Sequence, residues 1–543
     1  MKICNIGLSA IGALIGFLLF SGIPSIADGT KNSVESRGPH EPSQVLTIRE
    51  AIKSGIENNL DVKAEELGIP MGKEGVIASK SVFDPTLEAS VGSTEQKNLS
   101  STILSSDDFN LYRDIDAKAG IKKRFLTGLE SSISLSTLKS MNNSSIDELR
   151  PQYNDVIVLD LTQPLLRDFG KDVNSAHIKI SEKQLMQAAN IYLDRAERIA
   201  GRIESLYYDL ALAEKTLTYR IDSKKLAQEL LEANKEKFKA GLVPVTEVQQ
   251  AETAIASRDE DIIQARQQVE TATNNLLDLL GARNRAASQD WIKTQSLSAS
   301  DMEQKLPAFD EALAVALKKR PDLEAQRFYV ESKDINLRYY KNQRLPRLDL
   351  KATLGLNGLS GGDRPVSFLG NTVSSHLVGD YWDSVQNMTH GHEWFVGMRF
   401  SYPIGNRGPE AMFRQADLER RQAVYRLKRL EDTVETDIKN ALVNTHRGLE
   451  RVKVAERFEH LAEITLSQEM DRLKEGLSDT FHILQYQNDV ISAKIKKAAA
   501  LADFNKGVAS LYLSMGTNLD RYGIAAAVPD DIGKNKNSLT INY

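Results

Sequence analysis

Apolar and small residues recur at alternating steps of three and four residues through the segment that follows Pro164. This spacing is a seven-residue repeat, which is typical of a long helix packed in a coiled coil. Charged side chains fill the positions between, as expected for a face in water. The pattern predicts one helix over residues 171–240, about 105 Å long at 1.5 Å per residue. Its seam consists of Leu185, Ala189, Tyr192, Ala196, Ile199, Ile203, Leu206, Leu210, Ala213 and Leu217.

A second helix is predicted directly after the first. Gly241 and Pro244 end the first helix, and a new apolar seam then continues to Gly281 with one charged position, Arg258. The short connection predicts an antiparallel hairpin. A plain coiled-coil spacer would show the same pattern, so the hairpin alone does not indicate a function. The second seam consists of Val248, Ala251, Ile255, Ile262, Ala265, Val269, Ala272, Leu276 and Leu279.

The same layout occurs twice along the chain. Gly241-Leu242 and Gly476-Leu477 are 235 residues apart, and upstream pairs such as Pro85 and Pro346 are 261 residues apart. The change in offset assigns the length differences to loops. We therefore predict repeat 1 over residues 46–281 and repeat 2 over residues 307–516. A linker over residues 282–306 would join them, and residues 517–543 would form a C-terminal tail.

Four segments next to prolines alternate between apolar and polar residues, which predicts strands that are wet on one side. Strands of this length suit a transmembrane β-barrel, although an ordinary surface sheet would give the same alternation. The few strands of one chain cannot close a barrel around an open lumen. Further copies of the chain must therefore supply the remaining strands. The four segments are residues 87–91, 156–162, 348–354 and 395–402.

Repeat 1 holds one additional candidate hairpin. Residues 118–123 and 133–137 alternate on either side of a Thr127-Gly128 turn. They form either two more strands of the sheet or part of an enlarged external loop, and the sequence leaves both interpretations open. Residues 95–113 and 357–393 are polar, and we predict long connections there.

The first residues predict export from the cytoplasm. Lys2, an apolar stretch over residues 11–20 and the small-residue site ending at Ala27 predict a signal peptide over residues 1–27. A retained membrane anchor is the alternative. Residues 28–45 read as a flexible leader. The only cysteine is Cys4, so the mature chain would have no thiol for a disulfide, a nucleophile or a zinc ligand.

Composition agrees with an elongated assembly. Hydrophobic residues make up 41% of the 543 residues and charged residues 26%, which is polar for a chain long enough to bury a large core. Alanine-rich helix seams without a wide core explain this polarity. The net charge of −5 gives no basic field for nucleic acid.

The sequence holds two weak signals of chemistry and one aromatic cluster. Residues 358–362 fit G-x-S-x-G, but we predict them in a loop with no following helix. His390, His392 and Glu393 lack metal ligands from a second element. We therefore predict no catalytic residue, no metal site, no cofactor and no enzyme activity. An aromatic girdle and simple barrel packing both fit the cluster Trp382, Trp394, Phe395, Phe400 and Tyr402.

In its predicted layout of helices, strands and turns, the chain resembles the TolC-type outer membrane efflux proteins. The resemblance covers most of residues 46–516 and rests on the order, spacing and repetition of short motifs. These motifs are Gln163-Pro164-Leu165-Leu166-Arg167, Tyr402-Pro403-Ile404-Gly405 and the segment Phe238-Lys239-Ala240-Gly241-Leu242.

The resemblance implies an α+β membrane protein in the outer membrane of a Gram-negative-type bacterium, extending into the periplasm. Three copies would share one barrel, of about 12 strands in the usual member, above an α-helical barrel of long antiparallel coiled-coil helices. The linker and C-terminal region would form a belt around this tunnel. The partners would be a periplasmic adaptor (membrane fusion) protein, an inner-membrane pump of the RND or ABC type, and outer membrane lipid.

The resemblance also assigns roles to the two hairpin turns, which would lie at the periplasmic tip and contact the adaptor. The tip residues are Gly241, Leu242, Val243, Gly476, Leu477 and Ser478. Just past each turn the family often carries inward-facing acids. The corresponding positions here are Glu247, Gln250, His482 and Gln485, so the acids of the second repeat are absent. Our hypothesis is that three copies of His482 make the entrance more cationic below their pKa, about 6.5 for an unperturbed histidine. A tip-surface histidine that faces solvent is the alternative.

The predicted function is therefore an outer membrane exit duct for small molecules or secreted proteins. A periplasmic coiled-coil scaffold without a pore would explain the heptads but not the alternating strands. An exported enzyme lacks a matching constellation of residues. The sequence does not identify the cargo or the class of pump.

Overall fold

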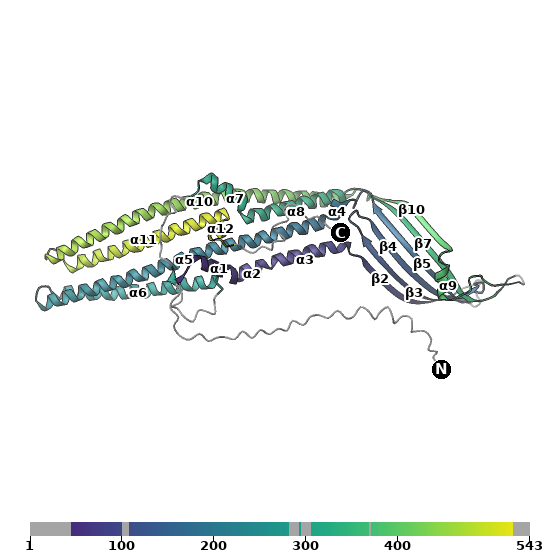
Figure 1. Cartoon of the computed structure of the whole chain (residues 1–543), viewed down its shortest axis with the longest axis horizontal. Helices are drawn as coiled ribbons and strands as arrows, with labels where there is room; N and C mark the ends of the chain where they lie inside the picture. Colours follow the sequence, from purple (N-terminus) through teal and green to yellow (C-terminus); the bar gives the residue numbers. More distant parts are fainter. Residues whose placement is uncertain (1–44, 100–107, 282–292, 295–305, 369–370, 525–543) are drawn as a thin grey trace, which may run out of the picture. The chain divides into compact units, whose positions relative to one another are not determined.

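Helices dominate the described part of the chain, which comprises residues 45–99, 108–281, 293–294, 306–368 and 371–524 of a computed structural model. The predicted signal peptide, nearly all of the leader, and most of the linker and tail lie outside these residues. Two helical hairpins lie at one end and the main sheet at the other (Figure 1). No described helix has both the length and the apolar character needed to cross a membrane.

The long helices confirm the heptad prediction. α5 (Ala176–Lys239) and α6 (Val245–Leu279) form the first hairpin, and α10 (Arg407–Lys474) and α11 (Thr480–Met515) form the second. Small seam residues bring the helices close: a Cβ added at Gly448 of α10 would lie 3.1 Å from Phe504 Cα of α11. The other helices are α1 (Ile48–Asn58), α2 (Leu60–Glu66), α3 (Gly68–Lys80), the 3-10 turn η1 (Ser81–Phe83), α4 (Lys171–Asn174), α7 (Phe309–Lys319), α8 (Pro321–Gln343), α9 (Tyr381–Asn387) and α12 (Asn518–Tyr522).

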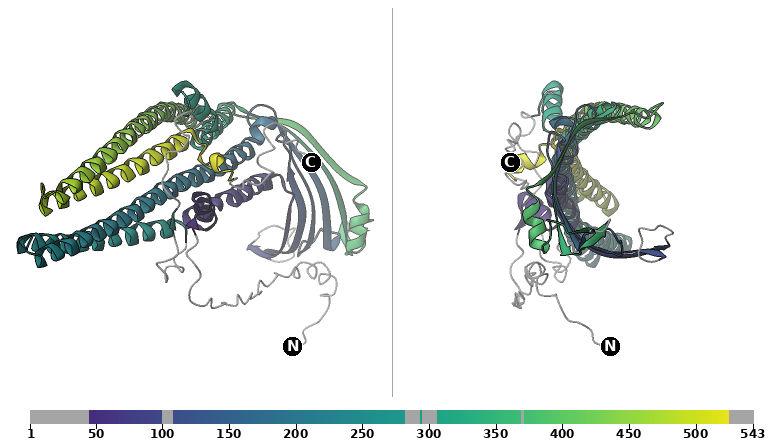
Figure 2. Two further views of the ribbon diagram at one scale, coloured as in Figure 1. Left: turned by 60° about the vertical axis from the view of Figure 1, so that its left-hand side comes forward. Right: turned by 90° about the vertical axis from the view of Figure 1, so that its right-hand side faces the viewer.

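The main sheet is curved and fully antiparallel, with the order β10-β7-β5-β4-β3-β2 (Figure 2). The candidate hairpin of repeat 1 is therefore part of the sheet, as β3 and β4. The main strands are β2 (Thr86–Leu99), β3 (Phe109–Arg124), β4 (Glu130–Asn142), β5 (Leu149–Pro164), β7 (Arg347–Asp363) and β10 (Gly391–Ser401). Two short pairs add β1 (Val45–Leu46) with β6 (Lys293–Thr294), and β8 (Val366–Phe368) with β9 (Asn371–Val373).

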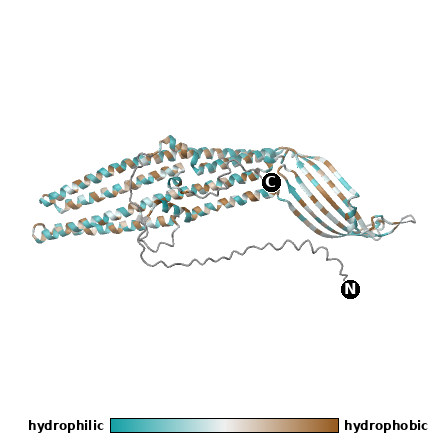
Figure 3. Cartoon of the chain, viewed as in Figure 1, coloured by the Kyte–Doolittle hydropathy of each residue, from teal (hydrophilic) through white to brown (hydrophobic). Residues whose placement is uncertain are grey.

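The register gives this sheet two chemically different faces, and Figure 3 shows the alternation along the strands. Leu87 lies opposite Ile121, Ile121 opposite Ile133, and the row continues through Leu159 and Leu354. One face is thus apolar, with Leu87, Val91, Ile121, Ile133, Leu135, Ile157, Leu159, Leu354, Leu356, Trp394, Val396, Met398 and Phe400. The other is largely polar, with Glu88, Ser90, Lys118, Lys122, Ser132, Ser134, Ser136, Asp160, Thr162, Lys351, Thr353 and Arg399.

Three sequence predictions about this region were wrong. The polar segments at residues 95–113 and 357–393 are not simple connections, because they contain strand ends, α9 and the start of β10. The G-x-S-x-G segment lies inside β7, where Ser360 is fully buried and donates to Asp380 O at 2.5 Å. His392 and Glu393 lie in β10 and not in a loop.

The helix α9 covers one end of the apolar face. A Cβ added at Gly358 of β7 would lie 1.9 Å from Ser384 O of α9, so only glycine fits this contact. Trp394 and Phe400 lie on the apolar face, whereas the register puts Phe395 on the polar face. The aromatic cluster is therefore split between two faces.

The short helix α12 connects the end of the second hairpin to the first. Glu197 of α5 accepts the backbone N–H groups of Asn518 and Leu519 at 3.1 and 3.3 Å. One heptad further on, the fully buried Glu204 accepts hydrogen bonds from Arg521 Nη1 at 3.0 Å and from the Tyr522 hydroxyl at 2.6 Å. Two buried carboxylates of α5 therefore hold α12.

Glu197 makes the attachment of α12 dependent on pH. Burial is the main cause that raises the pKa of Glu197 to about 7. Because this pKa lies above that of an unfolded glutamate, the contribution of Glu197 to stability is full below pH ~4.5 and is lost as pH rises through 7. Glu197→Gln stays neutral and should flatten this decline. Melting temperatures of both proteins from pH 4 to 8 test this, and parallel curves would contradict it.

Candidate functional site

The two hairpin turns have the same backbone design. Gly241 and Gly476 follow the ends of α5 and α10 with φ of 71° and 72°. In each turn the next residue donates back into the helix, Leu242 N to Lys237 O at 2.9 Å and Leu477 N to Arg472 O at 2.8 Å. This is the glycine-dependent helix end that reverses a chain sharply. It leaves the side chains of Leu242 and Leu477 exposed, 75% and 68%.

The remaining predicted tip residues, Val243 and Ser478, are both half-buried. The Ser478 hydroxyl donates to Glu469 Oε1 of α10 at 2.6 Å, which fixes the second turn to its own helix.

Hydrogen bonds join the two hairpins just above the turns. Asn234 Nδ2 of α5 donates to Thr480 Oγ1 of α11 at 2.7 Å and to Glu247 O of α6 at 3.2 Å. Thr480 N donates to Glu247 Oε2 at 2.9 Å. Asn234 and Thr480 are 2% and 1% exposed, so these bonds are shielded from water. We call Asn234, Glu247 and Thr480 the tip network.

The four predicted constriction residues lie in two different settings. The Glu247 carboxylate is a member of the tip network, where it accepts a bond from the first residue of α11. Gln250 and Gln485 line one groove of about 640 Å³ between α6 and α11.

His482 lies near the N-terminus of α11 beside the capping residue Asp479. Its Nδ1 lies 2.7 Å from Asp479 Oδ1, and its backbone N–H donates to the same oxygen at 3.0 Å. The bond from the His482 backbone is the main cause that lowers the pKa of Asp479. Asp479 therefore stays ionised next to His482.

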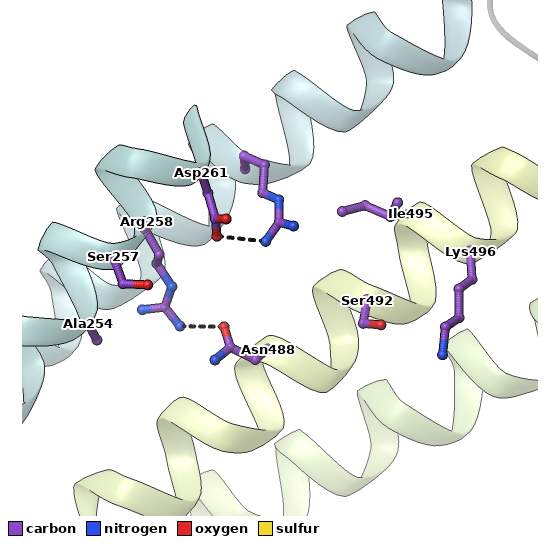
Figure 4. A pocket seen from close by; sticks show the side chains of 9 residues that line it. Ala254, Ser257, Arg258, Asp261, Asn488, Ser492, Ile495 and Lys496 are labelled. Atoms are coloured by element: carbon purple, nitrogen blue, oxygen red, sulfur yellow. Dashed lines mark hydrogen bonds and ion pairs between the residues drawn. The ribbon is translucent and has the colours of Figure 1, made fainter. Parts of the chain in front are cut away.

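A buried arginine forms a second connection between the hairpins. Arg258, the charged position in the α6 seam, is 3% exposed and donates through Nη2 to Gln487 Oε1 at 3.2 Å. Figure 4 shows it pointing from α6 toward Asn488 of α11, 3.4 Å from Oδ1. It lines a cavity of about 390 Å³ with Arg220, whose Nη1 pairs with Asp261 at 2.8 Å. Burial lowers the pKa of Arg258.

Sequence reasoning missed Asn234 and Thr480. Asn234 continues the step pattern of the first seam, three residues past Leu231, so a polar residue at an apolar position was the available signal. No cluster of three or more His, Cys, Asp or Glu side chains suited to a metal occurs within the described ranges.

Residues 51–282 match the model of the family described as outer membrane efflux protein. The predicted family resemblance is confirmed. The match to the outer membrane efflux protein family ends one residue after Gly281, the end of predicted repeat 1. A comparison with curated proteins gives no match.

Solved outer membrane channels share the fold of this chain. The outer-membrane channel OprN matches with a TM-score of 0.61 and 16% identity over 86% of this chain and 89% of that chain. CmeC from Campylobacter jejuni matches with a TM-score of 0.57 and 15% identity, over 90% of this chain and 89% of that chain. VceC from Vibrio cholerae matches with a TM-score of 0.59 and 15% identity, over 86% of this chain and 96% of that chain. At these identities the likeness shows the fold.

Proposed function

We propose that the chain forms a trimeric outer membrane channel for efflux or secretion. The sheets of three copies would form one barrel in the membrane, and the helical hairpins would form a tunnel in the periplasm. The two repeats each supply one hairpin, and the linker and α12 region surrounds the tunnel. A periplasmic adaptor and an inner-membrane pump complete the path, and the pump provides the energy because the channel is passive.

The observation that carries this proposal is the uncovered apolar face of the sheet. Val91, Trp394 and Met398 are 74%, 72% and 70% exposed. All three lie on the apolar face, Val91 on the edge strand β2 and the other two on the opposite edge strand β10. A water-soluble protein rarely leaves so large an apolar surface open. A strand wall with one apolar and one polar face instead suits lipid outside and water inside.

A periplasmic scaffold without a pore is the main alternative, and membrane fractionation separates the two. The full-length protein should be recovered in the outer membrane fraction and extracted by detergent as a trimer. A soluble monomer in the periplasmic fraction would contradict the proposal. An exported enzyme would need a reactive site, and the candidate Ser360 is covered by α9.

The turn glycines provide a test of the adaptor contact. Gly241→Val and Gly476→Val force a β-branched residue into a positive φ, which costs about 1–2 kcal/mol, and each should disturb adaptor docking and reduce transport. Gly75→Val is a matched control, since an added Cβ meets nothing within 4 Å at any of these three glycines and only Gly75 lacks a positive φ. Unchanged transport in both turn variants would show that the tip is elsewhere.

His482 provides a test of the entrance. Histidine is the side chain whose charge ordinarily changes between pH 5 and pH 8, and the His482 ring lies 2.7 Å from the Asp479 carboxylate. Single-channel conductance and cation selectivity should therefore change over this range in the wild type but not in His482→Ala. The same pH response in both proteins would exclude His482 from the conduction path.

A further inference from the structure

The sheet of one chain has six strands where the usual member of the family would supply four to a barrel of about 12. The difference is the β3–β4 hairpin, which lies between β2 and β5. Its strands have 16 and 13 residues, and a membrane-spanning strand needs about 9–11. Both strands are therefore long enough to cross the membrane.

The hairpin continues both faces of the sheet. Ile121 of β3 and Ile133 of β4 extend the apolar row between Leu87 and Leu159. On the opposite face β4 carries Ser132, Ser134 and Ser136, next to lysines of β3. A strand that separates isoleucine and leucine from a row of serines is built for lipid on one side and water on the other. A hairpin folded into an external loop would have no need of this separation.

Among the described residues, each of the two outer strands has a strand partner on one side only. β2 forms one edge with 14 residues and β10 the other with 11. Neighbours alternate in direction through all six strands, so β10 of one copy and β2 of the next would be antiparallel. In lipid each unpaired backbone group costs several kcal/mol, so open edges must close. The apolar face continues to both edges, at Val91 and at Met398.

We propose that β2 of one copy pairs with β10 of the next and that three copies close an 18-stranded barrel. This inference rests on the proposed trimeric channel and adds the strand count and the contact between copies. Barrel diameter grows roughly linearly with strand number, so this barrel is about 1.5-fold wider than one of 12 strands. The serine row of β4 lines the added width, which suits bulky hydrophilic cargo.

Disulfide crosslinking in the full-length protein tests the contact between copies. In a Cys4→Ser background, Ser90→Cys on β2 is combined in turn with Phe395→Cys, Gly397→Cys and Arg399→Cys on the same face of β10. At least one pair should give an oxidant-dependent covalent trimer on denaturing gels. Ser90→Cys with Ser134→Cys is the control, since β4 lies inside the sheet and should form no link between copies. Failure of all three edge pairs would overturn the inference.

Single-particle imaging of the detergent-extracted protein and of a hairpin deletion provides the second test. The wild type should show 18 strands. Deletion of Phe109–Asn142 removes β3 and β4, lets β2 pair with β5, and should reduce the barrel to 12 strands. A wild-type trimer with 12 strands and the β3–β4 hairpin outside the wall would refute this inference but leave the channel intact. Absence of any membrane-bound oligomer would instead refute the proposed function.

Discussion

Replacing Glu204 with methionine should lower the stability of the protein by about 3 kcal/mol, because it leaves the buried cation of Arg521 without its partner. Glu204 is fully buried, and the Arg521 side chain is 15% exposed. The variant also removes the bond from the Tyr522 hydroxyl. α12 should then detach from α5, which loosens the connection between the second hairpin and the first. A lower melting temperature and faster proteolysis of the C-terminal region are the expected readouts.

A double-mutant cycle isolates the charge pair from simple packing. Arg521→Met combined with Glu204→Met replaces both charges by apolar side chains, and such replacements of buried pairs are often close to neutral. The double variant should therefore be more stable than Glu204→Met alone. Additive losses in the two single variants would indicate that the pair is not coupled and that α12 is held by other contacts.

The helical part of the fold was predictable because its signal is repeated over many turns. The heptad steps located α5 and α6 to within a few residues, and the paired turn glycines located the ends of α5 and α10. The strand ends were not predictable in the same way. At Thr94, Glu95 and Gln96 both faces of β2 are polar, so alternation disappears although the backbone pairing with β3 continues. A strand segment that is polar on both faces is predicted as a loop from the sequence.

The tip network could not be predicted from the sequence, because its members belong to different hairpins. Asn234 and Thr480 are 246 residues apart, and each belongs to a different hairpin. The heptad pattern describes how a helix packs within its own hairpin and carries no information on the contact between hairpins. Asn234 and Arg258 were visible only as polar residues at seam positions. Their partners became identifiable only when the structure brought α11 beside α5 and α6.

The tip network should hold the periplasmic end of the channel closed, and its removal should raise conductance strongly. Asn234→Leu with Thr480→Val keeps the branched shape of both side chains and replaces both partners of the 2.7 Å bond between the hairpins. The variant also removes the 3.2 Å bond from Asn234 to Glu247 O within the first hairpin. One such bond contributes about 1 kcal/mol. If three copies must open together, the losses add to about 3 kcal/mol, which multiplies the open population by about 100.

Planar-bilayer recordings of the purified full-length channel measure this effect. Asn275→Leu with Thr271→Val makes the same chemical changes on α6, where Thr271 bonds only to its own helix at Gln267 O and both residues are exposed. This control should conduct like the wild type. A gain in open probability confined to the Asn234 and Thr480 variant would assign gating to the contact between hairpins. Equal conductance in all three proteins would mean that the tip opens without breaking this bond, and that α5 and α11 move as one unit.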